Sequence, residues 1–140
     1  MRVAVLQGED RAVAQWAGEK LGVTFQEPYR AFGFVGADGE LFAASVINHY
    51  YPGGNCEWTH YGPGIMPPSM LIFLADFVFV QLDCARVTAK TRRVNTLVQK
   101  LLQRYGWEFE FVQKRYFGPT KDEDAIVYVL WRNKATRWMQ

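Results

Sequence analysis

The chain opens with a short apolar stretch and then changes to a helical spacing of apolar residues. Val3–Leu6 predicts a short buried strand. Apolar side chains then recur three or four positions apart, at Val13, Trp16, Ala17 and Leu21. Asp10 before this stripe is a candidate N-cap, and Gly22 after it is a typical helix stop. The pattern predicts a strand followed by an amphipathic helix.

Three further apolar segments are separated by turn residues. Ala31–Val35 and Leu41–Tyr50 read as strands joined by a hairpin turn at Ala37–Glu40. Pro52–Asn55 is a second turn, and Cys56–Tyr61 is the next strand. Strands joined in sequence by short turns predict an antiparallel meander.

The middle of the chain combines an irregular loop with a strongly apolar helix. Gly62–Pro68 holds three prolines and two glycines, which excludes regular structure. Ser69 is the predicted N-cap of a helix over Met70–Leu82, whose only polar residues are Asp76 and Gln81. A helix that is apolar all round is expected to be covered on more than one face.

A strand and a second amphipathic helix follow. Ala85–Ala89 predicts the strand, and Asn95 precedes the helix, which Gly106 ends. The apolar stripe of this helix consists of Leu97, Val98, Leu101, Leu102 and Tyr105. Its regular spacing makes this the most clearly predicted helix of the chain.

The last part of the chain contains two further predicted strands, and the full order of elements then predicts the fold class. Trp107–Phe111 alternates strictly, which predicts a half-buried strand with its three rings on one face. After a polar loop at Gly118–Asp124, Ala125–Trp131 reads as a buried strand. The order predicts one α/β (α+β) domain over residues 1–140, with a mixed, mostly antiparallel sheet of about six to seven strands and helices on both faces.

Composition narrows the function classes. Sixteen Lys and Arg against fourteen Asp and Glu give a net charge of +2, without the basic excess of a nucleic-acid binder. The apolar run Met70–Val80 is too short to span a membrane. Cys56 and Cys84 make no disulfide framework, and neither has a Cys or His partner at zinc spacing. We therefore expect a cytoplasmic protein with no metal, nucleic-acid or membrane partner.

Two local patterns stand out in the chain. The strand Arg86–Ala89 leads to Asn95, and the helix ends at Tyr105–Trp107, with Asn95 and Gly106 eleven positions apart. A glycine-containing loop also runs from the third meander strand directly into a helix. Both patterns resemble the GNAT superfamily of acetyl-coenzyme A-dependent N-acyltransferases. The resemblance implies acetyl transfer from acetyl-coenzyme A to a primary amine by direct attack. It also implies that the cofactor contacts Gly62, Gly64, Ser69, Met70 and Asn95. Arg92 and Arg93 lie near Asn95 and either meet the cofactor phosphates or form a solvated turn.

The sequence departs from the family at two places. The usual phosphate loop, Gln/Arg-x-x-Gly-x-Gly/Ala, matches only Gly64, and the prolines of this loop lack the N–H groups that bind phosphate. Either Ser69, Met70 and nearby cations hold the phosphates, or cofactor affinity is low. Leu102 occupies the position where the family often has a tyrosine that acts as general acid. Tyr105 and Tyr116 are the phenols available nearby.

Glu57 and His60 are the candidate catalytic residues, because the family often carries a base on this strand. Alternation places Glu57 with Thr59 and Tyr61 on one face of the strand, and His60 on the other. His49 is a second candidate imidazole. The structural alternatives are a solvated strand glutamate and a packed core histidine, and both stay open.

Aromatic residues make up 16% of the chain, more than one core of this size needs. Tyr50, Tyr51, Trp58 and Tyr61 are expected to flank an acceptor cleft. Either Asn133–Gln140, with Trp138 and Met139, or a second subunit is expected to cover the apolar helix, and a homodimer is favoured. Two other functions remain: a non-catalytic GNAT-like binding or assembly module, and a phage-related structural or regulatory protein.

Overall fold

The computed structural model describes residues 3–63 and 66–135, which form a seven-stranded sheet in the order β1-β2-β3-β4-β5-β7-β6. The strands are β1 (Ala4–Leu6), β2 (Tyr29–Val35), β3 (Leu41–Asn48), β4 (Asn55–Tyr61), β5 (Arg86–Arg92), β6 (Glu108–Gln113) and β7 (Ala125–Trp131). The helices are α1 (Asp10–Leu21), α2 (Pro68–Ala75), α3 (Thr96–Arg104) and α4 (Arg132–Ala135), with a π-helical segment η1 (Asp76–Gln81) and a 3-10 turn η2 (Lys121–Glu123). This order confirms the predicted fold class.

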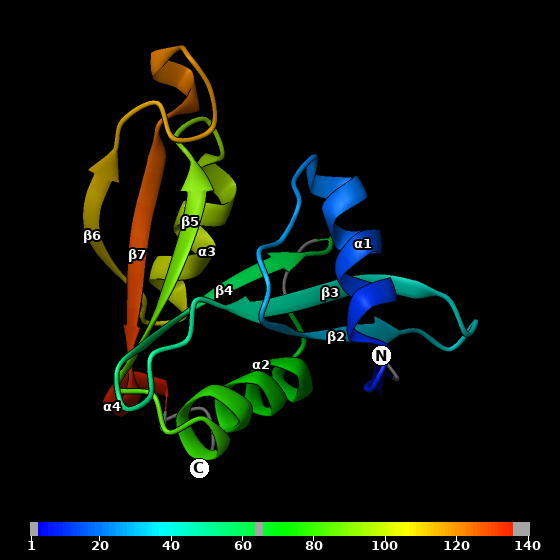
Figure 1. The fold of residues 1–140 in the computed structure, drawn as a ribbon. Coiled ribbons are helices and arrows are strands. Elements are labelled where there is room, and N and C mark those ends of the chain that lie inside the picture. Colours follow the sequence, from blue (N-terminus) through cyan, green and yellow to red (C-terminus); the bar gives the residue numbers. More distant parts are fainter. Residues whose placement is uncertain (1–2, 64–65, 136–140) are drawn as a thin grey trace.

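The sheet consists of two arms that meet at β4 and β5. These two strands run parallel, and they pair at three positions: Asn55 with Arg86, Cys56 with Val87, and Glu57 with Thr88. Beyond these positions the strands diverge (Figure 1). From Trp58 to Tyr61, β4 therefore pairs with β3 on one edge and with no described strand on the other.

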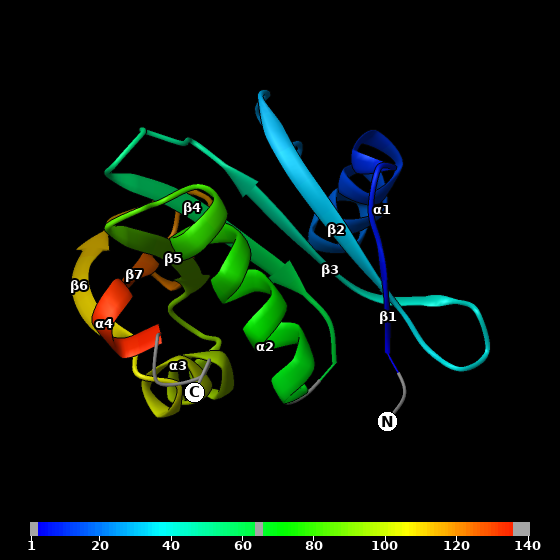
Figure 2. The same cartoon turned by 90° about the horizontal axis from the view of Figure 1, so that it is seen from below.

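Two layers of helix cover opposite faces of the sheet. On one face, α1 packs small side chains closely against β2 and β3, through Val13, Ala14, Ala17, Ala31, Ala44 and Val46. On the other face, α2 and η1 cross the sheet (Figure 2) and build the larger core, which includes Phe32, Phe34, Cys56, Trp58, Leu74, Val78 and Val87. The layering places Trp58 and His60 on the α2 side, and Tyr61 against Trp16 of α1.

The apolar helix differs from its prediction at its first residues. Ser69 is not the N-cap: α2 begins at Pro68, with Pro67 in the cap position. Proline suits the first helical turn because no N–H bond is needed there. In the single chain Ile72 is 41% exposed and Val80 is 59% exposed, so cover of this helix by the C-terminal segment or by a second subunit stays a prediction. Trp138 and Met139, which were expected to cover this helix, lie outside the described residues.

The N-terminal strand and the start of α1 also need correction. β1 is an edge strand that pairs with β2 and is not buried. Asp10 is not the N-cap of α1, a position that Glu9 takes. The Asp10 carboxylate instead accepts hydrogen bonds from Arg30 Nε at 2.8 Å and from the Ala31 backbone N–H at 3.2 Å. It ties the helix to β2.

A β-bulge breaks the expected alternation in β6. Phe109 pairs with Tyr128 and Phe111 with Val127, so Glu110 is the extra residue and the two phenylalanines do not share a face. Both rings are exposed rather than half-buried. The Glu110 carboxylate accepts from both terminal nitrogens of Arg86, at 2.6 and 2.7 Å, which lowers the pKa of Glu110.

The two cysteines are free, fully buried and in hydrogen-bond contact with each other. Burial raises the pKa of both thiols, which suppresses the reactive thiolate. We expect neither thiol to react with Ellman's reagent at pH 8 in the folded protein, and both to react in guanidinium. Fast reaction of either thiol in the folded protein would contradict this assignment.

None of the described helices combines the length and apolar character that crossing a membrane requires.

Candidate active site

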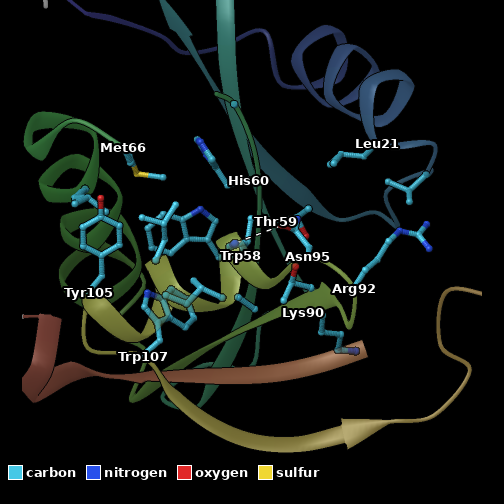
Figure 3. Close-up of a pocket in the computed structure, with 18 of the residues that line it drawn as sticks. Leu21, Trp58, Thr59, His60, Met66, Lys90, Arg92, Asn95, Tyr105 and Trp107 are labelled. Carbon is cyan, nitrogen blue, oxygen red and sulfur yellow. Dashed lines mark hydrogen bonds between the residues drawn. The ribbon is translucent and has the colours of Figure 1, made fainter. Parts of the chain in front are cut away.

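A cavity of about 300 Å³ opens where β4 and β5 diverge (Figure 3). β4 contributes Trp58, Thr59 and His60 to its wall, and β5 contributes Ala89, Lys90, Thr91 and Arg92. Helix α3 and the residues flanking it contribute Asn95, Val98, Leu101, Leu102, Tyr105 and Trp107. The cavity thus follows directly from the short pairing between the two arms.

The two ends of the cavity differ in character (Figure 3). Trp58, Tyr105 and Trp107 gather at one end, and the two indole rings lie 5.7 Å apart. Lys90, Arg92 and Asn95 lie toward the other end. The site therefore offers an apolar chamber and a polar mouth with two cationic side chains.

The apolar stripe predicted for α3 faces this cavity rather than a packed core. No residue of α3 is buried, yet Val98, Leu101, Leu102 and the following Tyr105 all line the cavity. Leu97 is the exception, because it is exposed and does not line the cavity. Apolar side chains that face a cavity favour a ligand with an apolar part.

Asn95 is both an N-cap and a cavity residue. Its Oδ1 accepts from the Val98 N–H at 3.3 Å, which confirms the predicted cap, and its side chain lies at the polar mouth (Figure 3). The two roles proposed for it from the sequence are therefore compatible.

The structure separates the two neighbouring arginines. Arg92 is exposed, lines the cavity and lies 4.5 Å from the centre of the Phe117 ring. Arg93 instead donates to Asp124 Oδ2 at 3.1 Å. Asp124 is buried, and hydrogen bonds led by the Arg115 backbone N–H lower its pKa. Arg93 therefore pairs with Asp124 and, unlike Arg92, does not line the cavity.

The loop before α2 contributes less than the resemblance implied. Gly62 lines the cavity, whereas Gly64 lies outside the described residues. Ser69 is exposed at the surface of α2, and Met70 is buried with its N–H donating to the Pro67 carbonyl at 3.0 Å. Neither Ser69 nor Met70 lines the cavity.

His60 lines the cavity, and its ring is hydrogen-bonded to Ser45 of the neighbouring strand β3. Its Nδ1 lies 2.7 Å from Ser45 Oγ, and Ser45 Oγ accepts from Trp58 Nε1 at 2.9 Å. Burial lowers the pKa of His60 from its ordinary value near 6.5 to about 4, so the ring is neutral at pH 7. Ser45 is a residue that the sequence did not single out, because its place opposite His60 depends on strand register.

Gly62 makes room for the His60 ring. A Cβ at this position would lie 2.7 Å from Ala43 Cβ and 3.0 Å from His60 Nε2. We expect Gly62→Ala to displace the ring and to lower the free energy of unfolding by about 1–3 kcal/mol, measured by urea denaturation. Gly54→Ala is the control, because its Cβ would meet ordinary contacts beginning at 3.5 Å. An equal decrease in the free energy of unfolding for the two substitutions would contradict a steric conflict between a Cβ at position 62 and Ala43 or His60.

Glu57 lies on the opposite face of β4 from His60, as alternation predicted. Its carboxylate contacts Lys90 Nζ at 3.2 Å and His49 Nε2 at 3.7 Å, and its side chain is 24% exposed. Glu57 is the last residue of β4 in register with β5. It therefore stands at the base of the opening, beside Lys90 of the cavity wall, and does not itself line the cavity.

The expected aromatic cluster around an acceptor cleft is not present. Trp58 is buried, Tyr61 packs edge-on against Trp16, and the Tyr50 hydroxyl donates to the Leu82 carbonyl at 2.9 Å. Tyr51 is exposed at the other end of β4. Of the two phenols considered near α3, Tyr105 lines the cavity, and Tyr116 lies over Lys90 with its ring centre 4.4 Å from Nζ. Within residues 3–63 and 66–135, no group of three His, Cys, Asp or Glu side chains is arranged to hold a metal ion.

No protein-family model matches the chain, and no curated protein sequence matches it. Solved structures do. Mutant forms of the spermidine/spermine N-acetyltransferase SpeG from Vibrio cholerae align with a TM-score of 0.79 at 12% identity, over 99% of this chain and 100% of that chain. A second structure of that enzyme gives 0.77 at 12% identity, over 99% and 98%. A GCN5-related N-acetyltransferase from Brucella melitensis gives 0.64 at 16% identity, over 79% of this chain and 56% of that chain.

Proposed function

We propose that this chain, which has the fold of the GCN5-related N-acetyltransferases, transfers an acetyl group from acetyl-coenzyme A to a primary amine. The observation that carries the proposal is the cavity between β4 and β5, beside an edge of β4 that pairs with no described strand. An extended ligand with amide groups pairs readily with such an edge as an added strand. The pantetheine arm of coenzyme A is a ligand of this kind.

The residues present fit this cofactor in part. The apolar wall and the free edge of β4 suit the pantetheine arm, and Arg92 and Asn95 at the mouth suit phosphate groups. The loop before α2 suits phosphate poorly, because its prolines lack N–H groups and the Met70 N–H is already bonded. When bound, acetyl-coenzyme A supplies the activated acetyl thioester. We assign phosphate binding chiefly to Arg92.

The adjacent arginines provide a matched test of this assignment. We expect Arg92→Ala to raise the Kd of coenzyme A about tenfold, the loss of one charge-assisted contact, with the melting temperature unchanged. We expect Arg93→Ala to lower the melting temperature, because Asp124 loses a partner, and to leave the Kd unchanged. Isothermal titration calorimetry and thermal unfolding measure the two quantities. The reverse pattern would move phosphate binding to Arg93.

We assign removal of the amine proton to Glu57, with His60 as the other candidate. An attacking amine must be neutral, and a carboxylate accepts its proton directly or through one water. Glu57 lies on the face opposite the α2 and α3 layer, so an amine and the cofactor would approach the opening from different sides. This arrangement keeps the two reactants apart until they meet at the opening.

Cofactor binding and acetyl transfer together test the function. Acetyl-coenzyme A at millimolar concentration should raise the melting temperature if the folded protein binds it. Transfer is then measured across a panel of amines that includes a polyamine, since the Vibrio cholerae enzyme is named for spermidine and spermine. The absence of a thermal shift would contradict the proposal.

A non-catalytic binding module is the second candidate, favoured by Leu102 in the cavity wall at the position of the family's usual acid. A thermal shift with acetyl-coenzyme A but no transfer to any amine would support this candidate over the enzyme.

We further propose a cytoplasmic homodimer that buries the exposed Ile72 and Val80 of the α2–η1 helix. Light scattering coupled to size-exclusion chromatography should give twice the mass of one chain. A monomer at micromolar concentration would remove this proposal.

A further inference from the structure

Ser45 lies fully buried in β3, directly opposite His60 of β4. Its hydroxyl has two partners, Trp58 Nε1 at 2.9 Å and His60 Nδ1 at 2.7 Å, and no third partner within the described part of the chain. An indole N–H only donates, so Ser45 Oγ is the acceptor of the first hydrogen bond. The direction of the second hydrogen bond follows from this one.

The Ser45 hydroxyl has a single proton to donate, and His60 Nδ1 is the acceptor within reach. If Nδ1 carried a proton, it would donate to Ser45, and the buried Ser45 hydroxyl would be left without an acceptor. Nδ1 is therefore the acceptor. In a neutral imidazole the remaining proton then resides on Nε2.

Nε2 of His60 is the atom that remains available for a ligand. It lies next to Gly62, where a Cβ would come within 3.0 Å, and it has no hydrogen-bond partner among residues 3–63 and 66–135. Because His60 lines the cavity, its free N–H is placed beside the ligand space.

We propose that Ser45 is a positioning residue that holds His60 in the Nε2–H tautomer, so that His60 presents a hydrogen-bond donor to the cavity and is not the base. This inference rests on the proposed function in one respect: the expected acceptor is the carbonyl oxygen of the acyl group. A neutral N–H aimed at that oxygen favours the negative charge that develops there during attack. Removal of the amine proton then falls to Glu57, on the opposite face of β4.

The tautomer is measurable in the free protein. Long-range proton–nitrogen NMR correlation on uniformly labelled protein at pH 7 should show His60 protonated at Nε2 and unprotonated at Nδ1. His49, which is exposed, gives the reference signals in the same spectrum. Protonation of His60 at Nδ1 would overturn the proposal. Because this readout needs no cofactor, it stays informative if acetyl-coenzyme A fails to bind.

Variants separate positioning from structural support. Ser45→Ala should abolish the tautomer preference, and Ser45→Thr, which keeps the hydroxyl, should restore it. If Ser45→Ala does not fold, the wild-type spectrum still decides the question.

Activity then distinguishes donor from base. A glutamine amide offers an N–H near the position of Nε2, whereas phenylalanine offers none. We expect His60→Gln to keep kcat/KM within about fivefold of wild type and His60→Phe to lose at least about 100-fold. Equal losses in the two variants would support a base and contradict the donor.

Discussion

Glu57→Gln is expected to lower kcat/KM for acetyl transfer by about 100-fold or more, with the affinity for acetyl-coenzyme A unchanged. General-base catalysis contributes about 100- to 10,000-fold, and the amide preserves the size of the side chain but accepts no proton. The defect should shrink as the pH approaches the pKa of the amine, because a neutral amine needs no base. Steady-state kinetics from pH 7 to pH 10 measure both effects.

Glu110→Gln is the matched control for this substitution. Glu110 is also a strand glutamate in an ion pair, with Arg86 at 2.6 Å, but it lies on β6, which β5 and β7 separate from β4 and the opening. We expect its kcat/KM to stay within about twofold of wild type, since it touches no reacting group. Wild-type rates in Glu57→Gln together with an inactive His60→Gln would transfer the base role to His60.

His60 is expected to make the folded protein less stable in acid. Its pKa is near 6.5 in the unfolded chain and about 4 in the folded one, so between these values the unfolded state binds more protons. The stability contributed by the neutral ring is complete above pH 6.5 and is lost as the pH falls to 4. A pKa difference of this size corresponds to roughly 3 kcal/mol, at about 1.4 kcal/mol per pH unit.

Urea denaturation at pH 7 and pH 4 measures this loss. Acid also protonates carboxylates such as Glu110 and Asp124, whose lowered pKa values remove stability in the same direction. The decisive quantity is therefore the difference between wild type and His60→Gln, with the exposed His49 substituted in the same way, His49→Gln, as the control. Parallel losses in wild type and His60→Gln would show that the ring is not desolvated.

Most elements of this fold follow from local signals in the sequence. The turn at Ala37–Glu40, the Asn95 cap and the αL glycine after α1 depend on neighbouring residues, so the sequence predicts them. The bulge at Glu110 and the divergence of β4 from β5 depend on pairing between distant segments, which local periodicity does not contain.

The candidate site is predictable to a smaller extent, for the same reason. Asn95 and Arg92 reach the cavity, but nothing in the sequence distinguishes Arg92 from Arg93, whose partner Asp124 lies on a distant loop. An apolar stripe that faces a cavity has the same spacing as one that faces a core, so the sequence of α3 does not predict that it lines a cavity. The contact of Ser45 with His60 depends on the register of β3 with β4, which the sequence does not predict.

The short pairing between β4 and β5 also has a mechanical consequence. Within the sheet, the β4–β5 pairing joins the two arms over three register positions, at the closed end of the opening. A ligand that pairs along β4 would extend this junction into a continuous hydrogen-bonded seam. Backbone amides in the strands on both sides of the bound ligand would then exchange their hydrogens more slowly than in the free protein. The ligand would act as an additional strand of the sheet.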